Sequence, residues 1–162
     1  MPDESRHFIA VRRFGTFLRY WGPAILWMIV IFSGSTDMMS AGRTSRFIRP
    51  FFRWLQPNIS EEALDQIQYV IRKGAHLTEY ALLGFLLWRA CRKPVRNDPR
   101  GWTWRDVVTA FCLAAAYSAS DEIHQAFVPS REAHLTDVFI DMAGASIGLL
   151  AVWLWGHWRG RW

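Results

Sequence analysis

Long apolar runs with few charged residues inside them dominate the hydropathy pattern of the chain. Residues 20–36 contain no charged side chain, and neither do residues 142–156, which residues 135–141 extend on their N-terminal side. A helix needs about 20 mostly apolar residues to cross the roughly 30 Å of hydrocarbon in a bilayer. The pattern therefore predicts a membrane-spanning helix near each end of the chain.

Two further apolar runs are interrupted by polar residues. Residues 107–120 are uncharged, and the run continues through a short polar stretch to Pro129. Residues 74–90 carry His76 and Glu79 in their first turns before a continuous apolar block. The complete pattern predicts an all-α integral membrane bundle of four transmembrane helices, with spans at about 18–36, 74–90, 107–128 and 135–157.

Composition supports this class of fold. The 162 residues are 51% hydrophobic and 20% charged, so the chain is too apolar for disorder and of a length that predicts one domain over residues 1–162. The two cysteines, Cys91 and Cys112, suit neither a disulfide scaffold nor a metal knuckle. A soluble helical bundle and a signal peptide at the first run are the alternatives. The first run, however, is apolar on every face, and only Ser33-Gly34-Ser35 resembles a cleavage site.

The basic residues lie outside the apolar runs and predict an orientation. With four spans, the N-terminus, the second loop and the C-terminus share one side of the membrane, and together they hold more Lys and Arg than the first and third loops. The positive-inside bias therefore places both termini in the cytoplasm. Because these residues flank spans, the net charge of +5 gives no support for a nucleic-acid partner.

The first outer loop, residues 35–72, is too long to be a simple connection. Its aromatic residues alternate with arginines, a composition typical of an interfacial helical segment, and Pro50 argues against one unbroken helix there. Ser60 resembles an N-cap followed by Glu61 and Glu62, so a helix is expected to begin outside the bilayer and run into the second span. The segment either grips a substrate or only covers the bundle.

Polar residues collect at one end of all four predicted spans. They occupy the start of the second and fourth spans and the end of the third, which is the outer half in each case because the direction of the chain alternates. A charged side chain at mid-span costs about 3 kcal/mol on insertion scales, so such residues indicate function by default. The alternative is a structural network in which they neutralise one another. The predicted binding residues are Lys73, His76, Glu79, Tyr80, Asp121, Glu122, Gln125, Arg131, Asp137 and Asp141.

Helical spacing groups these residues into faces. In the third span Asp121, His124 and Gln125 share one face, while Glu122 points about 100° away. The corresponding stripe of the second span consists of Lys73, His76 and Glu79.

In the fourth span, Asp137 and Asp141 share a stripe that continues through Gly144 and Gly148. This GxxxG spacing lets a neighbouring backbone approach closely, which would bring the two carboxylates near the other helices.

Two stretches, RKGAHLTEYALLG at 72–84 and SDEIHQAFVPSR at 120–131, resemble the VanZ-like family of bacterial membrane proteins, which is associated with teicoplanin resistance. The chain departs from the family pattern at Asp141, where Asn is usual, and at Ser130, where Gly is common. The resemblance covers residues 20–155 and implies a small multi-pass protein of the bacterial cytoplasmic membrane that affects glycopeptide susceptibility or envelope glycolipids. The matching positions are Lys73, His76, Glu79, Tyr80, Asp121, Glu122, Gln125, Phe127, Pro129, Arg131, Asp137 and Gly144.

The leading functional hypothesis is a polar outer-leaflet pocket that binds a head group. Its partners would be membrane lipids, with a lipid-linked cell-wall precursor or a glycolipid as ligand. Lys73 and Arg131 would bind phosphate or carboxylate, while Gln125 and the carboxylates would bond hydroxyls or amides. No cofactor is predicted, and the sequence leaves open both the oligomeric state and whether the protein is an enzyme.

The alternative hypothesis is a metal-dependent membrane hydrolase or transferase that acts on a lipid-linked substrate. Proton-coupled transport is disfavoured because the inner halves of the spans are apolar. Ser120, Asp121 and His124 resemble a catalytic triad in composition only. The metal ligands in the hydrolase hypothesis would be His76, Glu79, His124 and either Asp121 or Asp137, with Glu122 as the base.

Overall fold

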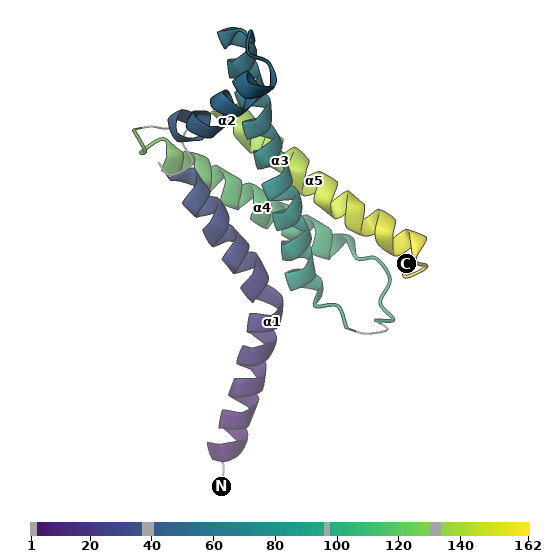
Figure 1. Ribbon diagram of the computed structural model, residues 1–162. Coiled ribbons are helices and arrows are strands. Elements are labelled where there is room, and N and C mark those ends of the chain that lie inside the picture. Colours follow the sequence, from purple (N-terminus) through teal and green to yellow (C-terminus); the bar gives the residue numbers. More distant parts are fainter. Residues whose placement is uncertain (1–2, 37–40, 96–97, 130–133) are drawn as a thin grey trace.

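The computed structural model describes residues 3–36, 41–95, 98–129 and 134–162, and this part of the chain is all-helical, as predicted. It forms five helices and no strand (Figure 1). The helices are α1 (Asp3–Ser35), α2 (Ala41–Leu55), α3 (Glu61–Arg92), α4 (Trp104–Gln125) and α5 (Leu135–Trp158).

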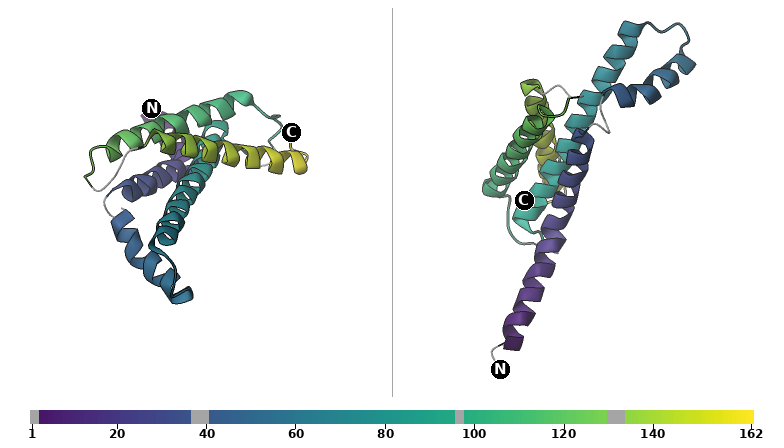
Figure 2. Two further views of the ribbon diagram at one scale, coloured as in Figure 1. Left: turned by 90° about the horizontal axis from the view of Figure 1, so that it is seen from above. Right: turned by 90° about the vertical axis from the view of Figure 1, so that its left-hand side faces the viewer.

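Helix α3 organises the bundle, because it contacts each of the other four helices and packs most extensively against α5. Its 32 residues correspond to about 48 Å, longer than the hydrocarbon of a bilayer. The first turns of α3 therefore project beyond the other helices together with α2 (Figure 2). The predicted N-cap is confirmed, since Ser60 Oγ accepts a hydrogen bond of 3.2 Å from the backbone N–H of Ala63.

Helix α2 confirms a helical segment in the first loop, but the expectation about Pro50 is wrong. Pro50 lies inside α2, which continues to Leu55. A proline removes one backbone hydrogen bond from a helix and does not by itself end it. Arg49 and Arg53 bond the carboxylates of Glu61 and Asp65, which ties α2 to the start of α3.

Helix α1 begins before the predicted start of the first span at residue 18, and it contacts the bundle along a single stripe. Tyr20, Ala24, Ile31 and Ser35 are buried along this stripe. Most of the remaining apolar surface of the helix is uncovered, as expected of a helix that faces lipid. The exposed apolar side chains of α1 include Phe17, Ile25, Leu26, Ile29 and Phe32.

Two helices are long and apolar enough to cross a membrane, over Arg13–Ser35 of α1 and Leu135–Trp158 of α5. The other two predicted spans lie in α3 and α4, which carry His76, Glu79, Asp121 and Glu122 and are less apolar. Helix α4 ends at Gln125, three residues before the predicted end at 128. Length and hydropathy therefore support two of the four predicted spans.

Small residues allow α3 and α5 to cross closely, as the GxxxG spacing predicted. A Cβ atom added to Gly84 would lie 2.8 Å from the carbonyl oxygen of Ala145. A Cβ atom on Gly144 or Gly148 would overlap the backbone carbonyl of Leu77 or Ala81. This close approach places the N-terminal turns of α5 against the middle of α3.

The opposite end of the bundle is rich in tryptophan and arginine. The guanidinium of Arg92 lies over the rings of Trp88 and Trp162, which both contact Trp102. Arg92 is 2% exposed and donates hydrogen bonds to the carbonyls of Arg100 and Gly101. In the same loop, the side-chain hydrogen bonds of Arg100 hold the pKa of Asp98 well below its usual range. Ion pairs and hydrogen bonds thus stabilise the connection between α3 and α4.

Candidate functional site

The polar end of the bundle is formed by the end of α1, the middle of α3, the end of α4 and the start of α5. Six of the predicted binding residues are buried there, and Asp137 is fully covered at 0% exposure. Buried ionisable groups need partners, so the contacts of this cluster define what it can do. The six residues are His76, Asp121, Glu122, Gln125, Asp137 and Asp141.

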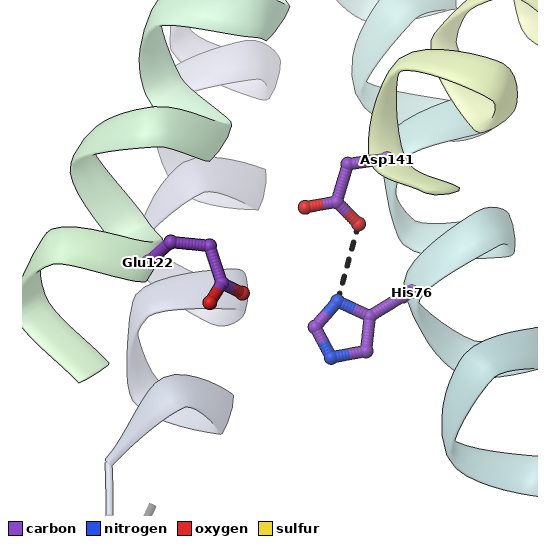
Figure 3. A group of neighbouring side chains, drawn as sticks. All are labelled: His76, Glu122 and Asp141. Carbon is purple, nitrogen blue, oxygen red and sulfur yellow. Dashed lines mark hydrogen bonds and ion pairs between the residues drawn. The ribbon is translucent and has the colours of Figure 1, made fainter. Parts of the chain in front are cut away.

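Two polar pairs connect α3 to α5. The ammonium group of Lys73 donates to Asp137 and also lies 5.1 Å from the centre of the Tyr69 ring. One turn further along both helices, His76 Nδ1 lies 3.1 Å from Asp141 Oδ1 (Figure 3). The spacing that placed Asp137 and Asp141 on one stripe therefore aligns them with Lys73 and His76.

Glu122 approaches the second pair from α4. Its carboxylate points toward the ring of His76 and the carboxylate of Asp141 (Figure 3). A nitrogen of His76 and one carboxylate oxygen each of Glu122 and Asp141 all lie within 4.8 Å of one another. The backbone N–H of His134 donates to Glu122 Oε2 at 3.0 Å, and Oε1 has no hydrogen-bond partner in the described part of the chain.

Asp121 faces a different neighbour, as its position about 100° from Glu122 on the helix predicts. Ser35 Oγ, at the end of α1, donates to the Asp121 carboxylate at 2.6 Å. Gln125 Nε2 donates to the same carboxylate at 3.0 Å. This second network joins α1 to α4.

The other predicted site residues make further contacts, or lie outside the described residues. Tyr80 is buried, and its ring centre lies 6.3 Å from that of Tyr117. Glu79 is half-buried, and its backbone carbonyl accepts a hydrogen bond from the Trp27 indole at 2.9 Å. His124 packs against Phe32, with a ring-centre distance of 4.6 Å. Arg131 lies outside the described residues.

Two residues of the polar end were not among the predicted binding residues. Ser118 is fully buried and donates to Asp141 Oδ2 at 2.7 Å, so it completes the hydrogen bonding of that carboxylate. Arg72 carries two guanidinium nitrogens, Nε and Nη2, that are buried without a hydrogen-bond partner in the described residues. Ser118 stands at helical spacing before Asp121 and Glu122, but a serine in an apolar run gives no functional signal by itself.

The possible metal ligands differ from those in the hydrolase hypothesis. Among the described residues, the potential ligand atoms of His76, Glu122 and Asp141 lie close together. Glu79 and His124 are not part of this group. Glu122, expected to act as a base, is thus placed among the potential ligands.

Two cavities in the described part of the chain lie away from the polar end. A cavity of about 1270 Å³ lies at the opposite end and is lined by residues that include Arg89, Arg92, Trp155 and Trp162. A second, of about 400 Å³, lies between α4 and α5 beside Trp102, Trp104 and Trp153. The polar residues form a packed network in this structure.

The described residues form helices with exposed apolar side chains and a buried polar cluster at one end, a combination typical of small helical membrane proteins. The family model described as VanZ/LLP1 matches residues 20–156, and the chain belongs to this family, as the two sequence stretches predicted. Family membership and the two apolar helices together indicate a membrane protein. No curated protein and no solved structure matches the chain significantly.

Proposed function

We propose that this VanZ-like protein crosses the bacterial cytoplasmic membrane four times, with α1, α3, α4 and α5 as the spans and both termini in the cytoplasm. The excess of Lys and Arg on the side of the termini supports this orientation. The polar end then faces the outer side of the membrane. The exposed Phe47, Phe51 and Trp54 of α2 would rest among the outer head groups.

We further propose that the polar end binds the phosphate-bearing head group of an envelope lipid or a lipid-linked cell-wall precursor. The observation that carries this proposal is the concentration, at that end, of buried polar atoms that have no hydrogen-bond partner among the described residues. Such atoms cost free energy unless a bonding partner reaches them. They are Arg72 Nε and Nη2, Tyr80 OH, Glu122 Oε1, His124 Nδ1, Gln125 Oε1 and Asp137 Oδ2.

The unpartnered atoms distinguish this proposal from a purely structural network. In a structural network the buried donors and acceptors satisfy one another, as they do around Asp141 and Asp121. Arg72 instead offers donors in the planar arrangement that suits phosphate oxygens. Lys73, expected to bind the phosphate, is already neutralised by Asp137. We therefore assign the phosphate to Arg72, with Arg131 as a second donor.

Binding of a wall precursor would also give a physical route to an effect on teicoplanin susceptibility. A glycopeptide acts on the same class of envelope molecule, so a protein that holds the precursor's head group would compete for it or change its supply. This part of the proposal depends on head-group binding.

Arg72→Gln is expected to weaken binding of a phosphate-bearing lipid by roughly 10-fold to 100-fold, because a hydrogen bond to a charged group contributes about 1.5–3 kcal/mol. Binding of a lipid-linked wall precursor, phosphatidylglycerol and diacylglycerol to the purified protein would be measured in detergent. The phosphate lipid that is the ligand should bind more tightly than diacylglycerol. Arg105→Gln, at an exposed site of the opposite end, is the matched control. Equal binding of all three lipids, with no effect of Arg72→Gln, would reject the proposal.

A further inference from the structure

Three metal-binding side-chain types meet in the interior of the polar end, and each comes from a different helix. His76 lies on α3, Glu122 on α4 and Asp141 on α5, and all three are buried, at 8%, 6% and 1% exposure (Figure 3). One potential ligand atom from each lies within 4.8 Å of the others. The close crossing of α3 and α5 at Gly144 and Gly148 helps to hold this arrangement.

One oxygen of each carboxylate is held by a hydrogen bond from a neighbouring group. Ser118 Oγ holds Asp141 Oδ2, and Asp141 Oδ1 faces His76. The backbone N–H of His134 holds Glu122 Oε2, and Glu122 Oε1 has no partner among the described residues. Hydrogen bonds to the outer oxygens of ligating carboxylates are typical of the supporting shell of a metal site.

The two carboxylates of the cluster favour a nearby positive charge. Two carboxylates converge here, and burying a carboxylate without a partner is costly. Lys73, the cation next to this group on α3, is engaged by Asp137 on the neighbouring turn of α5. Glu122 is more than nine-tenths buried, and its Oε1 has no hydrogen-bond partner among the described residues, so it is the group that an additional cation would satisfy best.

We propose that His76, Glu122 and Asp141 form a binding site for a divalent metal ion of the Zn²⁺ class. One imidazole nitrogen and two carboxylate oxygens suit zinc and its neighbours among the transition metals, whereas Ca²⁺ takes about 6–8 oxygen ligands and Mg²⁺ prefers carboxylates, phosphates and water. Ligand atoms of a tetrahedral zinc site lie about 3.3–3.5 Å apart, since zinc–ligand bonds are about 2.0–2.2 Å. The 3.1 Å between His76 Nδ1 and Asp141 Oδ1 is close to this spacing, and an oxygen of Glu122 lies within 4.8 Å of a ligand atom of each.

Three protein ligands leave at least one coordination position for water or for an oxygen of a bound phosphate. The two proposals share Glu122, but the head-group proposal rests on Arg72 and does not need a metal ion, so either one can fail without the other. Arg72 carries the head-group proposal, and the group formed by His76, Glu122 and Asp141 carries the metal proposal.

The test is a titration of the full-length protein in detergent, after removal of any affinity tag and treatment with a chelator. Zn²⁺, Mn²⁺, Mg²⁺ and Ca²⁺ would each be added in the absence of lipid. We expect one equivalent of Zn²⁺ to bind more tightly than Mg²⁺ or Ca²⁺. His76→Gln, Glu122→Gln and Asp141→Asn are each expected to weaken Zn²⁺ binding at least about 100-fold, more than the loss of a supporting residue would.

Two matched controls use the same chemistry at neighbouring positions. His124→Gln removes a histidine outside the group, and Glu79→Gln removes a carboxylate one turn from His76 on α3. Both are expected to bind Zn²⁺ like the unchanged protein. Glu122→Gln retains an oxygen that can accept the His134 N–H, so the local fold is preserved. Helicity and elution volume would show that each variant is folded.

A second measurement on the unchanged protein does not depend on any variant. X-ray absorption of the zinc-loaded protein should show a shell of nitrogen and oxygen with one imidazole and no sulfur, since Cys91 and Cys112 are not in the group. The proposal is overturned if the folded protein binds no stoichiometric Zn²⁺, or if the shell contains sulfur. Loss of binding in Glu79→Gln or His124→Gln, with binding retained in Glu122→Gln, would also overturn it.

Discussion

Lys73→Met is expected to lower the free energy of unfolding by about 3–5 kcal/mol, because removing one partner of a buried ion pair leaves the other charge uncompensated. The remaining partner would be Asp137, which is 0% exposed and lies between α3 and α5. Methionine keeps most of the apolar stem of lysine, so the loss is mainly that of the charge. Unfolding by heat or denaturant in detergent, followed by circular dichroism, measures the change.

Lys93→Met is the matched control for this substitution. Lys93 is exposed at the C-cap of α3, where replacement should change stability by less than about 0.5 kcal/mol. Adding Asp137→Asn to Lys73→Met removes the uncompensated charge and is expected to recover part of the loss. Equal stability of the Lys73→Met and Lys93→Met proteins would mean that the ion pair does not hold α3 to α5.

Gly148→Val is the second substitution with a large expected effect, a loss of about 3 kcal/mol, at the upper end of the usual cost of overpacking. A Cβ atom at position 148 would overlap the backbone carbonyl of Ala81, and backbone atoms cannot move aside as the end of a flexible side chain can. Helices α3 and α5 would have to separate, which would also move Asp141 away from His76. The same unfolding measurement tests this prediction.

Gly74→Val provides the comparison, because it makes the same change of residue in a helix of the same bundle. A Cβ atom at Gly74 meets nothing within 4 Å, and valine is a better helix former than glycine, so this variant should leave stability unchanged or slightly raised. If Gly74→Val and Gly148→Val lowered stability by the same amount, close packing at Gly148 would not be what positions α5.

Local periodicity is what made much of this fold predictable. The N-cap at Ser60 and the stripe that continues from Asp137 to Gly148 follow from residue spacing within one helix, and both are present. Family membership was predictable because two short stretches, 72–84 and 120–131, resemble the family pattern. In contrast, the sequence did not predict where α1 begins or that α2 continues through Pro50. A helix can continue through a proline when its neighbouring turns are stable, and a local pattern does not show this.

The pairing of polar residues was less predictable, because it depends on the rotation of each helix about its axis. Spacing grouped His76 with Glu79 and Asp121 with His124, but the structure brings His76 to Asp141 and Glu122, and Asp121 to Ser35. A single turn contains side chains that face different neighbours. For this reason the metal ligands inferred from one helix at a time differ from those that the bundle assembles.

The open pocket expected at the polar end depends on details that no local pattern specifies. The residues are brought together, yet six of them are buried in a packed network, and two cavities lie at the other end of the bundle. Arg72, whose guanidinium nitrogens Nε and Nη2 have no partner within the described ranges, became a candidate only once the contacts of Lys73 were known.

The proposed function depends most on the position of the polar end at the outer face of a four-pass protein. The direct test is labelling of single cysteines in spheroplasts by a membrane-impermeant thiol reagent, with Cys91 and Cys112 replaced by serine. Asn58→Cys and Arg105→Cys introduce exposed cysteines beyond the two ends of the bundle. We expect the cysteine at position 58 to react in intact spheroplasts and the one at position 105 only after permeabilisation. Reaction of both from the same side, or the reverse order, would contradict the account.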